Sequence, residues 1–235
     1  MNLKDLVRNL QIEMNKQGES LTLDGDFGPK TKAALDKFTL AMTLSKKPVV
    51  APVLDDAFIR APWLRYLAPL IGLSEYMFKL NDILAPHWPM VGLPQFKDLK
   101  GRDHAWCSLA ADWAMFKAGI KGTGNAMALS WRTWGKSCHY WFGSVLGIRH
   151  ASGGGHVTFF LYWVDESKRL AACLGGNQGD EVNVTVYNLS GNAKGCDEVI
   201  NGPRWPNSFP DGVILSPDAA KILIAQVPKQ SGSTT

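Results

Sequence analysis

Apolar positions in the first 44 residues recur at the spacing of amphipathic helices. In the first segment the i, i+3, i+4, i+7 pattern is formed by Leu3, Leu6, Val7, Leu10 and Met14. It predicts one helix that ends before Gly18. Pro29, whose ring already fixes a helical φ, follows a turn-like segment at 24–28 and predicts the start of a second helix through Phe38 and Met42. We therefore expect residues 1–44 to form a small all-α domain.

Residues 45–60 contain two prolines and mixed polarity, which indicates a linker. Beyond it, residues 63–78 predict a helix and residues 86–94 a loop. Residues 106–120 are apolar almost all round, a pattern typical of a helix that is buried on most sides. All nine Trp residues lie at or after position 63, so this part of the chain differs sharply in composition from the first domain.

After Gly143 the apolar pattern takes the period of strands. The predicted strands cover residues 145–150, 156–164, 169–174 and the alternating valines of 182–186, with a hairpin loop at 165–168. A central helix followed by antiparallel strands is an α+β arrangement. We therefore expect a second, larger domain over 61–228, with its central helix packed on an antiparallel sheet, and a flexible tail at 229–235.

Composition narrows the classes of protein that this chain can represent. With 235 residues, 46% of them hydrophobic and 20% charged, the sequence is typical of a globular protein. The net charge of +4 comes without a dense Lys/Arg stripe, which argues against a nucleic-acid partner. No apolar run approaches the roughly 20 residues that span a bilayer, so we expect no stable membrane insertion. Charges near the N-terminus argue against a secretory signal, and we expect the four cysteines to be free thiols.

Three residues in the larger domain form a candidate nucleophilic site. Cys107 falls at the start of the apolar helix, where free backbone N–H groups favour a thiolate. His156 opens a strand after three glycines, and Asn177 follows Gly-Gly at the end of a later strand. This order of Cys, His and Asn matches a nucleophile, a base and an orienting amide. Each residue also has an ordinary structural interpretation, namely a core thiol, a loop histidine and a turn asparagine.

Residues 61–206 resemble the cysteine peptidoglycan hydrolases of the NlpC and CHAP type. The likeness is carried by APWL (61–64), IGLSE (71–75), the segment AWCSLAADWAMFKAGIKGTGNAMALSW (105–131), WGK (134–136), GGGHVTFFL (153–161), LGGNQGDEVNV (174–184) and RWP (204–206). It implies a papain-like fold in which Cys107 is the nucleophile, His156 the base and Asn177 the third member. We assign substrate contacts to Trp106, Trp131, Trp134 and Gln178.

The first domain is similar to the small helical peptidoglycan-binding domains of wall hydrolases. The likeness lies in LVRNLQIEMNKQG and in the DG-x-FG-x-x-T motif of residues 24–31. Together the two resemblances imply a phage endolysin that cleaves an amide or peptide bond of the cell wall, works without a cofactor, has peptidoglycan as its partner and acts as a monomer. Such a protein would be made in the host cytoplasm and reach the wall only after release.

Three alternatives remain open from the sequence. A zinc-dependent muramoyl amidase would draw ligands from Cys138, His139, His150 and His156, although their spacing matches no strong zinc pattern. A muramidase would use Glu75 as its general acid, with a second carboxylate at a defined separation. An antibacterial amidase delivered as an effector would share the chemistry of the endolysin but not its origin.

Overall fold

A computed structural model describes residues 3–16, 18–44, 51–101, 104–191 and 195–229. The chain divides into two compact units, Met1–Pro52 and Val53–Thr235. The first unit contains the two predicted helices, α1 (Leu3–Lys16) and α2 (Pro29–Leu44). In both units, no helix of the described residues is long and apolar enough to cross a membrane.

The turn between α1 and α2 is organised around the buried side chain of Gln11. Its Nε2 donates to Asp24 Oδ1 at 2.8 Å and to Thr31 Oγ1 at 3.1 Å, while its Oε1 accepts from the backbone N–H of Gly25 at 3.0 Å. A buried amide is stable only when its donors and acceptor are all used, as they are here. The conformation of this turn therefore depends on a polar centre.

The second unit contains a seven-stranded sheet. Its strands are β1 (Lys136–Ser137), β2 (Val145–Arg149), β3 (Gly155–Asp165), β4 (Leu170–Gly175), β5 (Asn183–Asn188), β6 (Glu198–Val199) and β7 (Arg204–Trp205). The order is β1-β7-β2-β3-β4-β5, with β6 also paired to β2, and every pair is antiparallel. The α+β class with an antiparallel sheet is confirmed.

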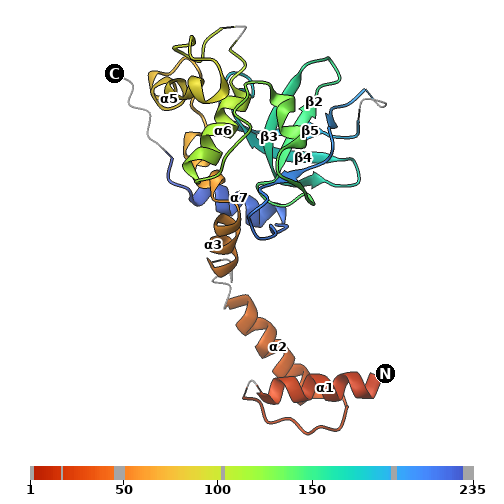
Figure 1. Cartoon of the computed structure of the whole chain (residues 1–235). Coiled ribbons are helices and arrows are strands. Elements are labelled where there is room, and N and C mark those ends of the chain that lie inside the picture. The colour runs from red at the N-terminus through yellow and green to blue at the C-terminus, as the bar shows by residue number, and fades with distance from the viewer. Residues whose placement is uncertain (1–2, 17, 45–50, 102–103, 192–194, 230–235) are drawn as a thin grey trace. The chain divides into compact units, whose positions relative to one another are not determined.

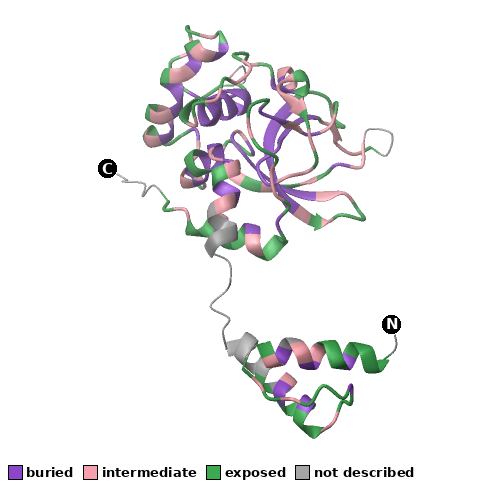
Figure 2. Cartoon of the chain, turned by 60° about the horizontal axis from the view of Figure 1, so that its bottom comes forward, coloured by how far each residue is buried: buried purple, intermediate pink, exposed green. Residues whose placement is uncertain are grey.

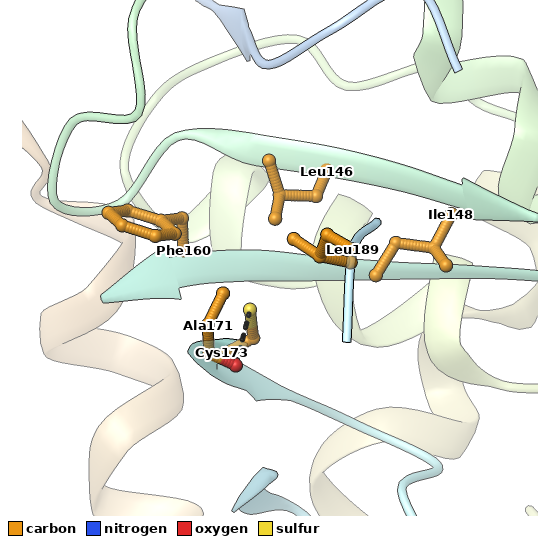
Figure 3. Close-up of a cluster of buried hydrophobic side chains, with 6 residues drawn as sticks. All are labelled: Leu146, Ile148, Phe160, Ala171, Cys173 and Leu189. Carbon is orange, nitrogen blue, oxygen red and sulfur yellow. Dashed lines mark hydrogen bonds between the residues drawn. The ribbon is translucent and has the colours of Figure 1, made fainter. Parts of the chain in front are cut away.

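Helix α6 (Cys107–Lys117) packs beside β3 and β4 (Figure 1). Its residues from Cys107 to Met115 are all buried (Figure 2), as the all-round apolar pattern predicts. A buried apolar cluster on β2, β3, β4 and the residue after β5 contains Leu146, Ile148, Phe160, Ala171, Cys173 and Leu189 (Figure 3). This cluster anchors the centre of the sheet, and α6 packs on β3 and β4 of the same sheet.

The helix predicted over 63–78 is wrong as a continuous element. The chain forms α4 (Trp63–Leu67), a 3-10 turn η1 (Ala68–Leu70) and α5 (Phe78–Leu84). Pro69 lies at the start of η1, and Gly72 has a φ of +90°, which a helix does not allow. The segment predicted as a loop at 86–94 begins within a 3-10 helix, η2 (Ala85–Val91).

Part of the predicted linker is helical. Helix α3 (Ala51–Arg60) buries Ala57 and Phe58, and Phe58 packs edge-on against Phe142 with ring centroids 6.0 Å apart. Arg60 Nη1 donates to the backbone oxygen of Asp211. Residues 56–60 therefore belong to the second unit, whereas residues 45–50 lie outside the described part of the chain. The helical elements η3 (Ala128–Thr133) and α7 (Pro217–Gln226) and the short strands β1, β6 and β7 are not predicted from the sequence.

Asp112 is a buried carboxyl group in the middle of α6. Its Oδ1 accepts from the backbone N–H of Gly124 at 3.0 Å and its Oδ2 from the hydroxyl of Thr123 at 3.1 Å. Burial raises its pKa to about 6, against the lowering effect of these two hydrogen bonds. Asp112 therefore fixes the loop after α6, and its charged form is disfavoured in the folded protein.

Replacing Asp112 by Asn is expected to stabilise the protein above pH 6. Because the pKa is raised from 3.8 in the folded state, the native carboxyl is favoured in its protonated form, and stability is lost as pH rises through about 6. Asn keeps an acceptor for Gly124 and carries no charge. Urea unfolding should show the variant gaining about 2 kcal/mol relative to wild type between pH 4 and pH 8. The exposed Glu166→Gln variant is the control, and an equal difference at both pH values would contradict the assignment.

Candidate active site

Cys107 is the first residue of α6 and is 3% exposed. Its sulfur is within hydrogen-bonding reach of the backbone N–H groups of Val157 and Ser108 and of its own N–H, and each of these lowers the pKa of the thiol. Burial acts in the opposite direction and is the larger effect, so the pKa is raised overall. The predicted thiolate at the helix start is therefore not the resting state, and the thiol is neutral at pH 7.

His156 lies at the start of β3, next to Val157, and is 5% exposed. Its Nε2 lies 3.2 Å from Oε1 of Gln178. Burial lowers the pKa of His156 to about 4, although the hydrogen bond to Gln178 opposes that shift. At neutral pH the imidazole is uncharged and can accept a proton.

The carboxamide of Gln178 is held from both ends. Its Nε2 donates to the backbone oxygen of Asn183 at 2.7 Å and to Oδ1 of Asn183 at 2.9 Å. Its Oε1 accepts from the hydroxyl groups of Thr158 at 2.9 Å and Tyr187 at 3.1 Å. Because a backbone carbonyl can only accept, the amide nitrogen must face Asn183 and the amide oxygen must face His156.

This orientation determines the tautomer of His156. An amide oxygen only accepts, so the ring nitrogen that contacts it, Nε2, must carry the proton. Nδ1 is then the nitrogen with a free lone pair. The aromatic ring of Tyr187 lies 5.7 Å from the imidazole of His156, and Tyr187 is also close enough to Cys107 to interact with it electrostatically. Cys107, His156 and Gln178 therefore share one buried environment.

The contact predicted for Asn177 is made by Gln178. Asn177 has a φ of +58° and lines a separate hollow of about 330 Å³ together with Glu75, Tyr76, His104 and Asp180. No hydrogen bond joins Asn177 to His156 in the described structure. Asn is one of the few residues that tolerate a left-handed backbone, so the turn interpretation of this residue fits its conformation. The sequence signal for Gln178 is Thr158, which shares the face of β3 with His156 and needs a polar partner.

The two glycines before this loop leave room for its neighbours. A Cβ on Gly175 would lie 2.7 Å from both Gln178 Oε1 and Thr158 Oγ1. A Cβ on Gly176 would lie 2.4 Å from the Trp106 ring and 2.6 Å from Ala110. The Gly-Gly pair is thus required for close packing of the loop against α6 and for the position of the Gln178 amide.

A groove of about 540 Å³ opens at Cys107. Arg149 is the one charged residue in the lining of this groove. The other lining residues are mainly apolar: Leu93, Ala105, Ala126, Met127, Ala128, Leu129 and residues 153–155. Arg149 forms a long ion pair with Glu198, with 4.0 Å between Nη1 and Oε2. The groove therefore offers apolar contact beside Cys107 and the positive charge of Arg149 in its lining.

The tryptophans predicted to line the groove do not do so. Trp106 and Trp131 are fully buried, because their indole N–H groups donate inward to Glu75 Oε2 at 3.0 Å and to Ser108 Oγ at 2.9 Å. Trp134 is half-buried and donates to the backbone oxygen of Lys121. All three stabilise the core around α6 and its following loop, and Gln178, also predicted as a substrate contact, holds His156.

The residues of the zinc alternative do not assemble as a ligand set in the described ranges. His150 and His156 lie side by side with ring centroids 5.8 Å apart. However, no group of three or more His, Cys, Asp or Glu side chains suited to a metal ion occurs among the described residues. Glu75, the general acid of the muramidase alternative, is buried and accepts a hydrogen bond from Trp106, with Asp180 lining the same hollow.

Comparison of the chain with protein-family models, curated proteins and solved structures finds no match.

Replacing Gln178 by Ala is expected to let His156 populate both of its neutral tautomers. Nε2 would lose the oxygen that requires its proton, so both neutral forms would be populated. Spectra of the full chain with ¹⁵N-labelled histidine should show one neutral tautomer in wild type and a mixture in Gln178→Ala. Asn177→Ala is the matched control and should retain the wild-type tautomer. A mixture of tautomers in Asn177→Ala, with a single tautomer in Gln178→Ala, would show that Asn177 orients His156 instead.

Proposed function

We propose that this protein is a peptidoglycan hydrolase with a papain-like catalytic domain, in which Cys107 attacks an amide carbonyl and His156 acts as base and acid. The observation that carries the proposal is the tautomer of His156, whose Nε2 is held by Gln178 so that Nδ1 can accept a proton. It is supported by the position of Cys107 at a helix start that lines an open groove. This is the arrangement that a thiol nucleophile needs.

The chemistry is an acyl transfer in two steps. His156 takes the thiol proton as sulfur bonds to the carbonyl carbon, and the resulting imidazolium gives that proton to the leaving amine as the C–N bond breaks. Water then loses a proton to His156 and hydrolyses the thioester, which restores the free thiol. Backbone N–H groups at the start of α6 stabilise the negative oxygen of each tetrahedral intermediate.

Peptidoglycan is proposed as the substrate because of the family likeness in both units. The stem peptides of peptidoglycan carry free carboxylates, and Arg149 offers a positive charge in the lining of the groove beside Cys107. The first unit, with its DG-x-FG-x-x-T turn held by Gln11, is proposed to bind the wall. Access to the wall would follow release from the host cytoplasm, by phage lysis or by delivery as an effector.

Replacing Cys107 by Ser is expected to abolish wall lysis while leaving the fold intact. The two side chains are nearly isosteric, but a hydroxyl is a far weaker nucleophile than a thiol near neutral pH. Turbidity assays on purified walls should show a loss of about 10³-fold or more. Cys138→Ser is the control and should retain activity, because Cys138 lies outside the groove.

The same assay separates the alternatives. A muramidase that uses Glu75 would continue to release reducing sugar in the Cys107→Ser variant. A zinc amidase would lose activity with EDTA and in the Cys138→Ser variant. Either result would overturn the cysteine mechanism.

Removal of the first unit is expected to weaken wall binding without loss of the catalytic fold. A chain of residues 53–235 keeps all but the first two residues of α3, including Phe58, which packs on Phe142, and should unfold cooperatively. Its sedimentation with insoluble walls should fall by about tenfold or more, because tethering to a second site raises the local substrate concentration. A chain starting at residue 61 lacks α3 and should be less stable. Equal binding of the full and shortened chains would contradict a wall-binding role for the first unit.

A further inference from the structure

A second histidine lies against His156. His150 directly follows β2, and its ring is nearly parallel to that of His156, with centroids 5.8 Å apart and an interplanar angle of 27°. The strand register explains the contact. Ile148 pairs with His156, so His150 is the diagonal neighbour of His156 on the same face of the sheet. The ring of Tyr187 lies beside both histidines, at 6.2 Å and 5.7 Å.

His150 has a carboxylate partner on the segment before β6. Its Nδ1 lies 3.2 Å from Asp197 Oδ2, and the other carboxylate oxygen accepts from the backbone N–H of Ala151 at 3.2 Å. The backbone of Asp197 is fixed in turn, because its N–H donates to the oxygen of Asn188. Both side chains are only partly exposed, at 31% and 21%. The pair is therefore held in place from two segments of the chain.

We propose that His150 and Asp197 are positioning residues that control the protonation of the catalytic imidazole of His156. The inference rests on the proposed role of His156 as base and acid, and it adds two residues that touch neither the substrate nor Cys107. Their effect reaches His156 across the stacked rings, in a buried region where charges interact more strongly than in water.

The charges around His156 support this control. The titratable or charged groups that face or flank the ring are Cys107 on α6, Arg149 and His150 at the end of β2, Tyr187 on β5, and Asp197. A protonated His150 disfavours a second positive charge on His156, and the Asp197 carboxylate favours it. In the intact pair these two effects oppose one another. Removal of either partner should therefore shift the protonation of His156, in opposite directions.

The balance matters for the proposed reaction. During acylation His156 becomes an imidazolium and must then give its proton to the leaving amine. A carboxylate near the ring without a positive partner would make the imidazolium too weak an acid. A positive charge without a carboxylate would make the imidazole too weak a base. The paired arrangement keeps His156 between these limits.

The test is a pH titration of the full chain labelled with ¹⁵N-histidine, in wild type, His150→Phe, Asp197→Asn and the double variant. His150→Phe keeps an aromatic ring in the stack but leaves Asp197 without a counter-charge, so the His156 midpoint should rise by about one pH unit. Asp197→Asn removes the carboxylate that favours a positive charge on His156, so the midpoint should fall. The double variant should return close to wild type. His139→Phe, at an exposed histidine, is the matched control.

The direction of the shifts separates electrostatic control from simple support of the fold. If the pair only supports the loop, each single variant would admit water and move the His156 midpoint upward, toward the ordinary value for histidine. Upward shifts in both variants, or no shift in either, would overturn the proposal. The titration does not depend on wall lysis, so inactivity of the wild-type protein would count against the proposed function alone. Where lysis is observed, the acid limb of its pH profile should move with the His156 midpoint.

Discussion

An amide group donates at one end and accepts at the other, and the surroundings of Gln178 leave one way to place it. The carbonyl of Asn183 requires the NH₂ group, and the hydroxyls of Thr158 and Tyr187 supply protons to the oxygen. Reversing the amide would set its oxygen against the backbone oxygen of Asn183, and the loss of that hydrogen bond would cost on the order of 1–3 kcal/mol. The tautomer of His156, and with it the ring nitrogen that is able to accept a proton, depends on this constraint. The rest of the site is arranged so that the constraint is met.

The sequence predicts the fold well where the apolar pattern is long and regular. The helices at Leu3–Lys16 and Cys107–Lys117 and the strands β2 to β5 follow their predicted segments closely. It fails where local chemistry interrupts the pattern, as at Pro69 and Gly72, which break an otherwise helical run. It also fails for the two-residue strands, since two residues are too few to show a period. Helix α3 lies in the predicted linker, because Pro48 and Pro52 indicate a linker and the burial of Phe58 depends on Phe142, far along the chain.

In the candidate site, too, some residues can be predicted from the sequence and others cannot. Cys107 and His156 could be chosen from the sequence because a helix start and a strand start are visible in the pattern. The third residue could not, because the choice between Asn177 and Gln178 depends on the course of a loop in which Asn177 takes a φ of +58°. A displacement of one residue turns a side chain away from His156 toward the hollow beside Glu75. The predicted substrate contact of Trp106 fails for a similar reason, because its buried indole N–H donates inward to Glu75.

Burial gives the proposed pair of Cys107 and His156 its chemical character. Loss of solvation raises the pKa of the thiol and lowers that of the imidazole, so both groups are neutral before substrate binds. A neutral thiol reacts slowly with oxidants and alkylating agents, because the thiolate is the reactive form. Proton transfer to His156 is then favourable only as the carbonyl accepts the sulfur and its charge moves to the oxygen near backbone N–H groups. In such a site, reactivity arises together with the substrate, and the rigid core around α6 and β3 provides the alignment that makes this possible.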